Sequence, residues 1–406
     1  MSEPVRTFRS GVLEPRARGV EFGAAHGERI AANVAAYRRL FAQAAGGAPL
    51  DVEALGGQAL AAIEGFAPEL HEEILGIAEG AGLAPELLGA VNARTELLAV
   101  AGRARRARAA AGGGSVSGGA AGAAGDRADD AAASRDASAA PVRGECSTAV
   151  KLSVDGTPPI GVQTWDWYDE LAGGWLVWEI PHPDGRRTTT LTEYGIVGKA
   201  GVNDRGIGLH FNILHHERDG ATVGVPVHVA GRAMLDRAGD VNQALLALHA
   251  AEVSASSCLT VVSAEGDGCA VCVELHPGGR GHVLPDERGL LLHTNHFLSQ
   301  PGAAGDTEPR EAPDTLVRLD LLRRRLHGRA ALTADELLAA FDCHAGGGGA
   351  LCCHPDTTLA PEARYATLAT VELDVAAGTL RALAGGPCAH RAPEPHTRSH
   401  EGDRPC

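Results

Sequence analysis

The segment from residue 103 to residue 143 divides this chain into two parts with different sequence patterns. A run of arginine and alanine gives way to glycine, serine, alanine and aspartate, with almost no large apolar side chain. Such a composition cannot bury enough surface to offset the entropy lost on ordering. We therefore predict a disordered linker or insertion between residues 1–102 and residues 146–390, and a disordered tail at 391–406.

The first part has the periodicity of helices. Between Gly27 and Ala45 one helical face carries the apolar residues Ile30, Val34, Tyr37, Leu40 and Phe41. Similar patterns occur at Leu70–Ala78 and Pro85–Ala99. Apolar residues at this spacing indicate amphipathic helices, so residues 1–102 are predicted to be mainly helical.

The part after Cys146 consists of short β-rich runs separated by turn residues. The expected strands are Thr148–Val154, Ile160–Trp165, Trp175–Ile180, Arg187–Tyr194, Gly206–Ile213, Cys258–Ala264, Cys269–Leu275, Leu290–Thr294, Tyr365–Asp374 and Thr379–Ala384. Helices are expected at Val227–Ala250, Thr315–Leu326 and Ala334–Phe341, the last with a capping box from Thr333 to Glu336. Consecutive antiparallel strands with helices between groups predict an α+β layered fold rather than a βαβ sheet.

Charge and hydropathy exclude two classes of partner. The formal net charge is −15, and the basic residues include only two lysines, Lys151 and Lys199. Nucleic-acid-binding proteins usually carry a clustered basic face, so nucleic acid is not expected as a partner. No apolar run approaches the length of a membrane span, and the N-terminus lacks the apolar core of a signal peptide. A cytoplasmic protein with free thiols among its nine cysteines is therefore expected.

Cys146 lies where the polar segment meets the first β-rich run, in Arg143–Ala149. A thiol at the start of a strand is accessible for nucleophilic chemistry. Taken alone, however, a cysteine at this position is more often a small buried residue.

Several other segments resemble, in order and spacing, the isopenicillin N acyltransferase family of autoproteolytic N-terminal-nucleophile (Ntn) hydrolases. They are Gly144–Asp166, Tyr194–His215, His293–His296 and Ala363–Leu368, together with Glu73–Gly80 and Asn92–Glu96 in the helical part. The resemblance covers most of the chain except the insertion and the two extreme termini. It implies a four-layer αββα sandwich with a mainly helical N-terminal segment, made as a precursor that cuts itself before its nucleophile.

In this chain the resemblance places the cut between Glu145 and Cys146. A thiol held against the preceding carbonyl can attack it and form a thioester that water hydrolyses. The freed α-amine has a pKa of about 8 and can act as the general base for its own thiol. The family usually has glycine before the nucleophile, which tolerates strained backbone, whereas Glu145 is expected to slow cleavage.

The resemblance also assigns the remaining catalytic residues. Asp166 would orient the nucleophile and its amine, and Asn295 would donate to the oxyanion. Arg364 would pair with Asp166 or with a substrate carboxylate. From the residues alone, Asp166 could equally be a surface aspartate at a strand end, and Arg364 a solvated arginine. Lys199 matches a family position as well.

The tryptophans cluster near Asp166, in a short region that holds all four of them. Aromatic residues in such a cluster are mostly core or pocket wall, and we expect Trp165, Trp167 and Tyr168 to contact substrate rather than stack nucleic-acid bases.

Metal sites have weaker sequence support. His293 and His296 would point to opposite faces of a strand, as would Cys269 and Cys272, so neither pair is expected to bind metal or act as a redox pair. The cluster formed by Cys343-His344 and Cys352-Cys353-His354 is a better metal candidate, but it lacks the paired two-residue spacing of structural zinc sites. No phosphate-binding fingerprint occurs, and we expect neither a cofactor nor a bound metal.

The sequence therefore predicts a cysteine Ntn acyltransferase or amidohydrolase that acts on amide or thioester bonds of small acylated molecules, acyl-coenzyme A being one candidate. The two cleaved chains are expected to stay associated. A catalytically silent relative that remains uncut and binds an acylated ligand or a partner protein is the alternative. A zinc-dependent protein built around Cys343–His354 is a third possibility.

Overall fold

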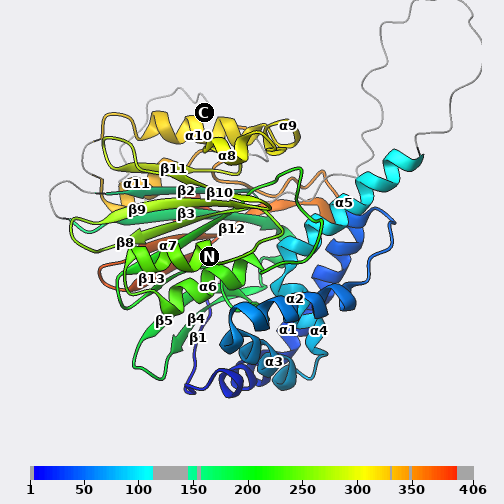
Figure 1. The fold of residues 1–406 in the computed structure, drawn as a ribbon. Helices are drawn as coiled ribbons and strands as arrows, with labels where there is room; N and C mark the ends of the chain where they lie inside the picture. Colours follow the sequence, from blue (N-terminus) through cyan, green and yellow to red (C-terminus); the bar gives the residue numbers. More distant parts are fainter. Residues whose placement is uncertain (1–3, 113–144, 153–156, 330–331, 347–349, 391–406) are drawn as a thin grey trace, which may run out of the picture.

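Two β-sheets stacked face to face form the centre of the molecule (Figure 1). The computed structural model describes residues 4–112, 145–152, 157–329, 332–346 and 350–390. The smaller sheet has the order β11-β2-β3-β12-β13 and the larger sheet the order β1-β4-β5-β6-β7-β8-β9-β10. The smaller sheet comprises β2 (Glu145–Lys151), β3 (Ile160–Tyr168), β11 (Leu290–His293), β12 (Tyr365–Asp374) and β13 (Thr379–Ala384). The larger comprises β1 (Thr7–Arg9), β4 (Trp175–Pro181), β5 (Arg187–Glu193), β6 (Ala200–Asn203), β7 (Ile207–Ile213), β8 (Ser257–Ser263), β9 (Cys269–His276) and β10 (Gly279–Val283).

Helices cover the outer faces of both sheets. The smaller sheet is covered by α10 (Asp314–Arg325) and α11 (Ala334–Phe341). Two short helices precede them: α8 (Gln300–Ala303) contacts β9 and β10 of the larger sheet, and α9 (Glu308–Glu311) contacts α10. The larger is covered by α6 (Val227–Arg237) and α7 (Val241–His249). Apolar side chains from both inner faces fill the space between the sheets, as expected for stacked sheets. This arrangement confirms the four-layer αββα sandwich.

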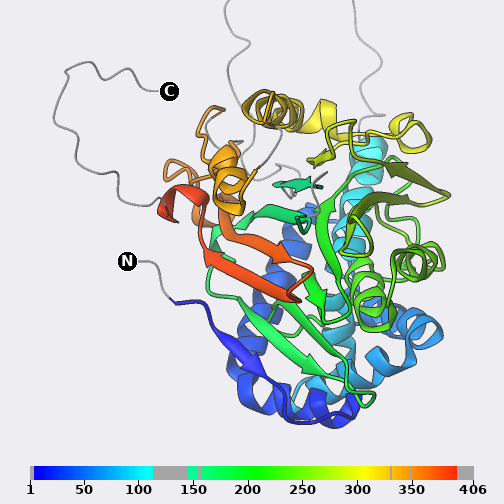
Figure 2. The ribbon, with the colours of Figure 1, turned by 90° about the vertical axis from the view of Figure 1, so that its left-hand side faces the viewer.

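The N-terminal helices form a separate group beside the larger sheet (Figure 2). They are α1 (Pro15–Ala45), α2 (Val52–Phe66), α3 (Pro68–Ala81), α4 (Pro85–Asn92) and α5 (Arg94–Gly112). Helices α1 and α3 pack closely because glycines face each other: a Cβ on Gly19 would lie 2.1 Å from the carbonyl oxygen of Glu73. Strand β1 extends this N-terminal part into the larger sheet, where it pairs with β4 in parallel.

Most expected elements are present, but some boundaries are corrected. Helix α5 continues to Gly112, so the first ten residues of the expected linker are helical. Arginine and alanine, which fill this stretch, are strong helix formers. The rest of the expected linker, 113–143, and the expected tail at 391–406 lie outside the described residues, as do the last two residues of the strand expected at Thr148–Val154.

The expected helix at Val227–Ala250 is two helices, α6 and α7, and Asp240 caps the second of them. Helix α11 has the predicted bounds and the predicted capping box. Cys258 and Cys272 form a disulfide, which corrects the expectation of free thiols for this pair. Within the described part, no helix is long and apolar enough to cross a membrane.

Buried charges join the N-terminal helices to the αββα layers. Glu73 on α3 is fully buried and accepts from the Nε of Arg18 on α1 at 2.7 Å. It also accepts from a guanidinium nitrogen of Arg232 on α6 at 3.0 Å. Arg232 is held in turn by Asp236, at 2.8 Å. One carboxylate therefore neutralises two arginines that come from the two parts of the chain.

We predict that Glu73→Ala lowers the free energy of unfolding by about 3–5 kcal/mol, because it leaves two buried guanidinium groups without their shared carboxylate. Chemical denaturation followed by circular dichroism measures this change. Glu72→Ala is the matched control, because Glu72 is half-exposed and pairs with the exposed Arg16. That control should change stability by less than about 0.5 kcal/mol. Equal effects of the two substitutions would contradict a structural role for the buried pair.

Candidate active site

Strand pairing in the smaller sheet brings Cys146, Asp166 and Asn295 together. Cys146 is the second residue of β2 and pairs with Trp165 of β3, one residue before Asp166. On the other side of β2, His293 of β11 pairs with Thr148, and Asn295 follows two residues later. Because β11 and β2 are antiparallel, the chain beyond His293 continues toward Cys146. All three side chains are buried.

The backbone of Cys146 is held at both of its polar groups. Its N–H donates to the Oδ1 of Asn295 at 2.9 Å, and its carbonyl accepts from the guanidinium of Arg318 at 3.0 Å. Arg318 lies on α10, is fully buried, and also donates to the Oδ1 of Asn295 at 3.0 Å. The amide Nδ2 of Asn295 donates to the carbonyl of Ile213 at 2.8 Å.

These contacts fix the orientation of the Asn295 amide. Its oxygen accepts from two N–H donors, and its nitrogen donates to a carbonyl. In a flipped amide the NH₂ group would face the two donors and the oxygen would face the carbonyl, so all three hydrogen bonds would be lost. In the uncut chain Asn295 therefore binds the backbone of Cys146 through its oxygen. The oxyanion role that the resemblance assigns to Asn295 would require its nitrogen, which here is bonded to Ile213.

The thiol of Cys146 is shielded from water. Burial raises its pKa to about 11, although the positive charge of Lys199 opposes this shift. The carboxylate of Asp166 raises the pKa further, while a hydrogen bond from the backbone of Asp166 lowers it. The thiol is therefore protonated at neutral pH in the uncut chain, and a nucleophilic attack requires a group that accepts its proton.

A buried ionic network that the sequence reasoning missed lies next to this thiol. Lys199 and Arg94 share the carboxylate of Glu193, at 3.4 Å and 3.2 Å. The ammonium of Lys199 lies 4.2 Å from the ring centre of Trp165. Burial, together with the nearby charge of Arg94, lowers the pKa of Lys199 to about 7. Arg94 falls in Asn92–Glu96, a segment of the resemblance to which no role was given.

The guanidinium of Arg364 lies elsewhere. Arg364 directly precedes β12, and its side chain donates to the carbonyls of Leu359 and Thr357 at 2.9 and 3.3 Å. Among the described residues, Arg364 makes no ion pair with Asp166. The positive charges of Lys199 and Arg318 lower the pKa of Cys146. The charge of Cys146 in turn raises the pKa of Arg94.

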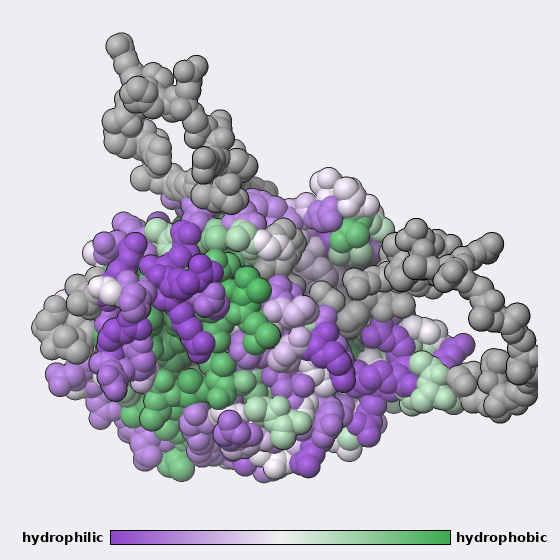
Figure 3. Space-filling model, turned by 90° about the horizontal axis from the view of Figure 1, so that it is seen from above, coloured by the Kyte–Doolittle hydropathy of each residue, from purple (hydrophilic) through white to green (hydrophobic). Residues whose placement is uncertain are grey.

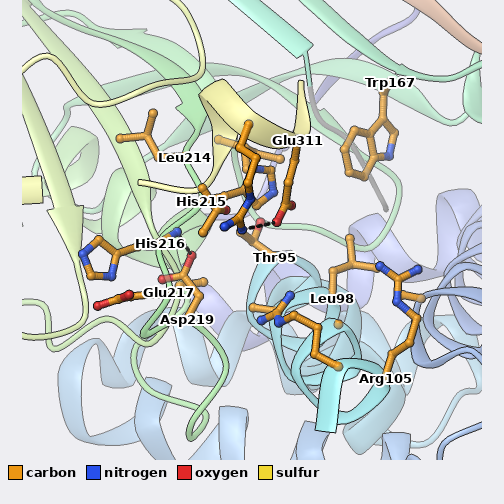
Figure 4. A pocket seen from close by; sticks show the side chains of 18 residues that line it. Thr95, Leu98, Arg105, Trp167, Leu214, His215, His216, Glu217, Asp219 and Glu311 are labelled. Carbon is orange, nitrogen blue, oxygen red and sulfur yellow. Dashed lines mark hydrogen bonds and ion pairs between the residues drawn. The ribbon is translucent and has the colours of Figure 1, made fainter. Parts of the chain in front are cut away.

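A pocket of about 260 Å³ opens between α5, the chain after β7 and α9 (Figure 4). Its apolar wall includes Leu98, Trp167 and Leu214, and Arg105, Arg106, Arg310, His215 and Glu311 supply charge. The pocket lies beside the nucleophile, because Ile213, which lines it, accepts the hydrogen bond from Asn295.

Of the three aromatic residues expected to contact substrate, Trp167 alone lines this pocket. Trp165 is buried beneath Lys199, and the ring of Tyr168 packs on that of Tyr365.

His215 brings a titratable positive charge to the pocket. Burial lowers its pKa, but the Glu308 carboxylate, 2.6 Å from its Nδ1, has the larger combined effect and raises the pKa to about 9. A group whose folded pKa exceeds its unfolded value of 6.5 stabilises the fold below pH 6.5, and this contribution is lost as the pH rises through 9.

We predict that wild type is more stable than His215→Gln at pH 6 and that the difference disappears by about pH 10. Urea denaturation of both proteins across this range measures the difference. A stability difference that stays constant with pH would contradict the ion pair.

The expectations for the other histidine and cysteine pairs can also be compared with the structure. His293 contacts the Glu274 carboxylate at 2.8 Å, whereas His296 contacts the hydroxyl of Thr315 at 3.0 Å. Cys272 is in the disulfide, and Cys269 is a separate free thiol. These residues have different partners, and one member of each pair, Cys272 and His293, lies with Cys258 in a buried group whose ligand atoms are within 4.8 Å of one another.

Comparison with known proteins confirms the resemblance. Residues 155–327 match the sequence model of the family described as acyl-coenzyme A:6-aminopenicillanic acid acyl-transferase. The 40 kDa form of acyl-coenzyme A:6-aminopenicillanic-acid-acyltransferase from Emericella nidulans is 27% identical over 200 residues, which is 49% of this chain and 51% of that protein. The chain thus matches about half the length of this curated relative.

Two solved structures are partly similar to this chain. A Caenorhabditis elegans orthologue of N-acylethanolamine-hydrolyzing acid amidase has a TM-score of 0.41 at 12% identity, covering 57% of this chain and 93% of its own. Penicillin V acylase from Agrobacterium tumefaciens has a TM-score of 0.39 at 13% identity, covering 59% of this chain and 83% of its own.

Proposed function

Given this similarity to acyltransferases, we propose that the chain is a cysteine Ntn acyltransferase or amidohydrolase activated by cleavage between Glu145 and Cys146. The observation that carries the proposal is the hydrogen bond from the Cys146 backbone nitrogen to Asn295 Oδ1 at 2.9 Å. Cleavage would turn this nitrogen into the α-amine of the new N-terminus. A buried acceptor is thus already placed where the amine of an Ntn hydrolase must be oriented.

The proposed cleavage uses the thiol as nucleophile. The sulfur of Cys146 attacks the carbonyl carbon of Glu145, the peptide C–N bond breaks, and the nitrogen of Cys146 takes up a proton as the α-amine forms. Water then hydrolyses the thioester, releasing the carboxylate of Glu145 and regenerating the thiol. The positive charge of Lys199 lowers the pKa of Cys146 and so favours the thiolate. The products would be residues 1–145 and 146–406.

The mature enzyme would repeat this attack on a substrate carbonyl. The α-amine would accept the thiol proton, the thiolate would form an acyl-enzyme, and water or an amine would release the acyl group. Arg94 is buried beside this centre, and among the described residues its guanidinium nitrogens lack hydrogen-bond partners apart from the ion pair to Glu193. These N–H groups could bind a substrate oxygen.

The pocket suggests the substrate class. Its apolar wall at Leu98, Trp167 and Leu214 suits an acyl chain, while Arg105 and Arg106 on α5 suit a carboxylate or phosphate on the same molecule. N-acylated amino acids and acyl-coenzyme A thioesters both combine these features. We therefore propose small acylated molecules with an anionic group as substrates.

A panel of N-acyl amino acids, neutral N-acyl amines and acyl-coenzyme A thioesters tests this assignment, with free acid and free amine or thiol measured by chromatography. Turnover of the anionic members above the neutral ones supports the proposal. The alternative is a silent relative that stays uncut and only binds such molecules, and Glu145 before the nucleophile is the feature that favours it. Cut protein that turns over no amide or thioester would contradict the proposed activity.

The proposed cleavage would leave two chains held together. Helices α1 to α5 belong to the first and all of the αββα layers except β1 to the second. Two buried ion pairs connect the first chain to the second: Glu73 with Arg232, and Arg94 with Glu193. Size-exclusion chromatography of the cut protein should therefore recover both chains in one peak.

A further inference from the structure

Two cysteines and two histidines converge where the loop after α11 meets the turn after β13. They are His344, Cys352, His354 and Cys388, and their ligand atoms all lie within 4.8 Å of one another. Cys388 belongs to a short 3₁₀ turn, Pro387–His390, that follows β13. Local spacing in the sequence indicates only the ligands between residues 343 and 354, because Cys388 is 34 residues away from His354 along the chain.

Three of the separations within this cluster are close to the edges of a metal coordination tetrahedron. The Nε2 atoms of His344 and His354 are 3.1 Å apart, and Nε2 of His354 lies 3.3 Å from the sulfur of Cys388 and 3.8 Å from that of Cys352. With Zn–N of about 2.0–2.1 Å and Zn–S of about 2.3 Å, a regular tetrahedron has edges of roughly 3.3–3.8 Å. We propose that these four residues bind one zinc ion.

The backbone around the cluster is anchored independently of any metal. The Cys352 N–H donates to the carbonyl of Cys343 at 3.1 Å, and the Cys353 N–H donates to the hydroxyl of Thr367 on β12 at 2.9 Å. Gly386 leaves room for the sulfur of Cys352, since a Cβ at that position would lie 2.5 Å from it. The ligands thus project from segments whose positions are set by α11, β12 and β13, as a preformed site requires.

The donor set indicates the metal and its role. Two thiolates and two imidazoles suit zinc, and four protein ligands leave no open position for a substrate or water. A structural role follows: the ion would join the loop before β12 to the turn after β13. Binding would release the thiol protons of Cys352 and Cys388. His344 and His354 are exposed, so the ion can enter from solvent.

The site is distinct from the proposed catalytic centre. Cys146 is held by Asn295 and Arg318, and neither belongs to the cluster. All four ligands lie after residue 146, so the cut state of the chain does not change the donor set. Failure of the acyltransferase proposal would therefore leave the zinc proposal standing, and the reverse also holds.

Full-length protein grown with zinc and purified without chelator provides the test, with metal content measured by mass spectrometry. Wild type is expected to retain about one zinc per chain after dialysis. Cys388→Ser and His354→Ala should bind zinc at least about tenfold more weakly, because each removes a ligand. Cys343→Ser and His390→Ala are matched controls that should retain the metal. Cys343 directly precedes the ligand His344, and His390 follows the ligand Cys388 by two residues, but neither belongs to the cluster.

Cobalt gives a second readout that does not depend on yield or activity. Chelator-treated wild type titrated with Co²⁺ should develop the visible absorption of tetrahedral cobalt with thiolate ligands, and far-ultraviolet circular dichroism identifies any variant that has not folded. The proposal is overturned if folded wild type binds no more zinc than folded Cys388→Ser. It is also overturned if unreduced wild type contains a Cys352–Cys388 disulfide and no metal.

Discussion

Replacing Cys146 with alanine is expected to leave the chain uncut and to reduce amide or thioester turnover by roughly 10³-fold or more, because one sulfur serves as nucleophile in both reactions. Intact mass and N-terminal sequencing of fresh protein measure cleavage without a substrate. Wild type should give two chains, one beginning at Met1 or Ser2 and the other at Cys146, whereas Cys146→Ala should give one. Cys269→Ala is the control, since Cys269 is a free thiol on β9 away from the proposed centre.

Two results would contradict this prediction in different ways. Cleavage of Cys146→Ala at the same bond would show that another group or a contaminating protease makes the cut. A single uncut chain in wild type as well would favour the silent relative. Glu145→Gly then separates the causes: cleavage of this variant would identify the side chain before the nucleophile as the obstacle, because glycine tolerates backbone strain that glutamate does not.

The local pattern of the sequence was sufficient to predict the strands that carry the proposed site. Runs of β-forming apolar residues bounded by turn residues predicted β3, β12 and most of β2. Such runs occur there because the side chains of these strands face a core on at least one side of the sheet. Short elements were missed where the signal is weak. Strand β6 has four residues, and β10, Gly279–Val283, contains two glycines. Seen from above, apolar side chains gather in one area of a largely hydrophilic surface (Figure 3), and sequence alone does not show which surface residues gather in this way.

The cations around the thiol could not be predicted in the same way, since they come from distant parts of the chain. Arg94 lies on α5 and Arg318 on α10, and only the packing of these helices against the sheets brings them to Cys146. The resemblance assigns the active-site arginine to Arg364, directly before β12, yet the guanidinium of Arg364 binds loop carbonyls. Cys388 was overlooked as a metal ligand for the same reason: long-range proximity leaves no trace in local spacing.

Substitution of Asn295 should distinguish its two possible roles in the mature enzyme. Asn295→Ala removes both hydrogen-bonding atoms and is expected to lower kcat by about 10²–10³-fold, the usual effect of losing a preorganised group beside the reacting atoms. Asn295→Asp retains an acceptor for the Cys146 amine and for Arg318 but cannot donate. If the amide acts through its oxygen, as in the uncut chain, Asp should retain clearly more activity than Ala.

The opposite pattern would restore the oxyanion role. A donor to the oxyanion is lost equally in Asp and Ala, and a carboxylate would also repel the developing negative charge, so Asp would be as inactive as Ala or worse. Asp should not reach wild-type activity in either case, because Asn295 also donates to the carbonyl of Ile213, which lines the pocket. The pH dependence of kcat/KM for Asn295→Asp adds an independent readout. A carboxylate beside the Cys146 amine favours its protonated form, so the acidic limb, where activity rises as the amine loses its proton, should shift to higher pH only if the side chain faces that amine.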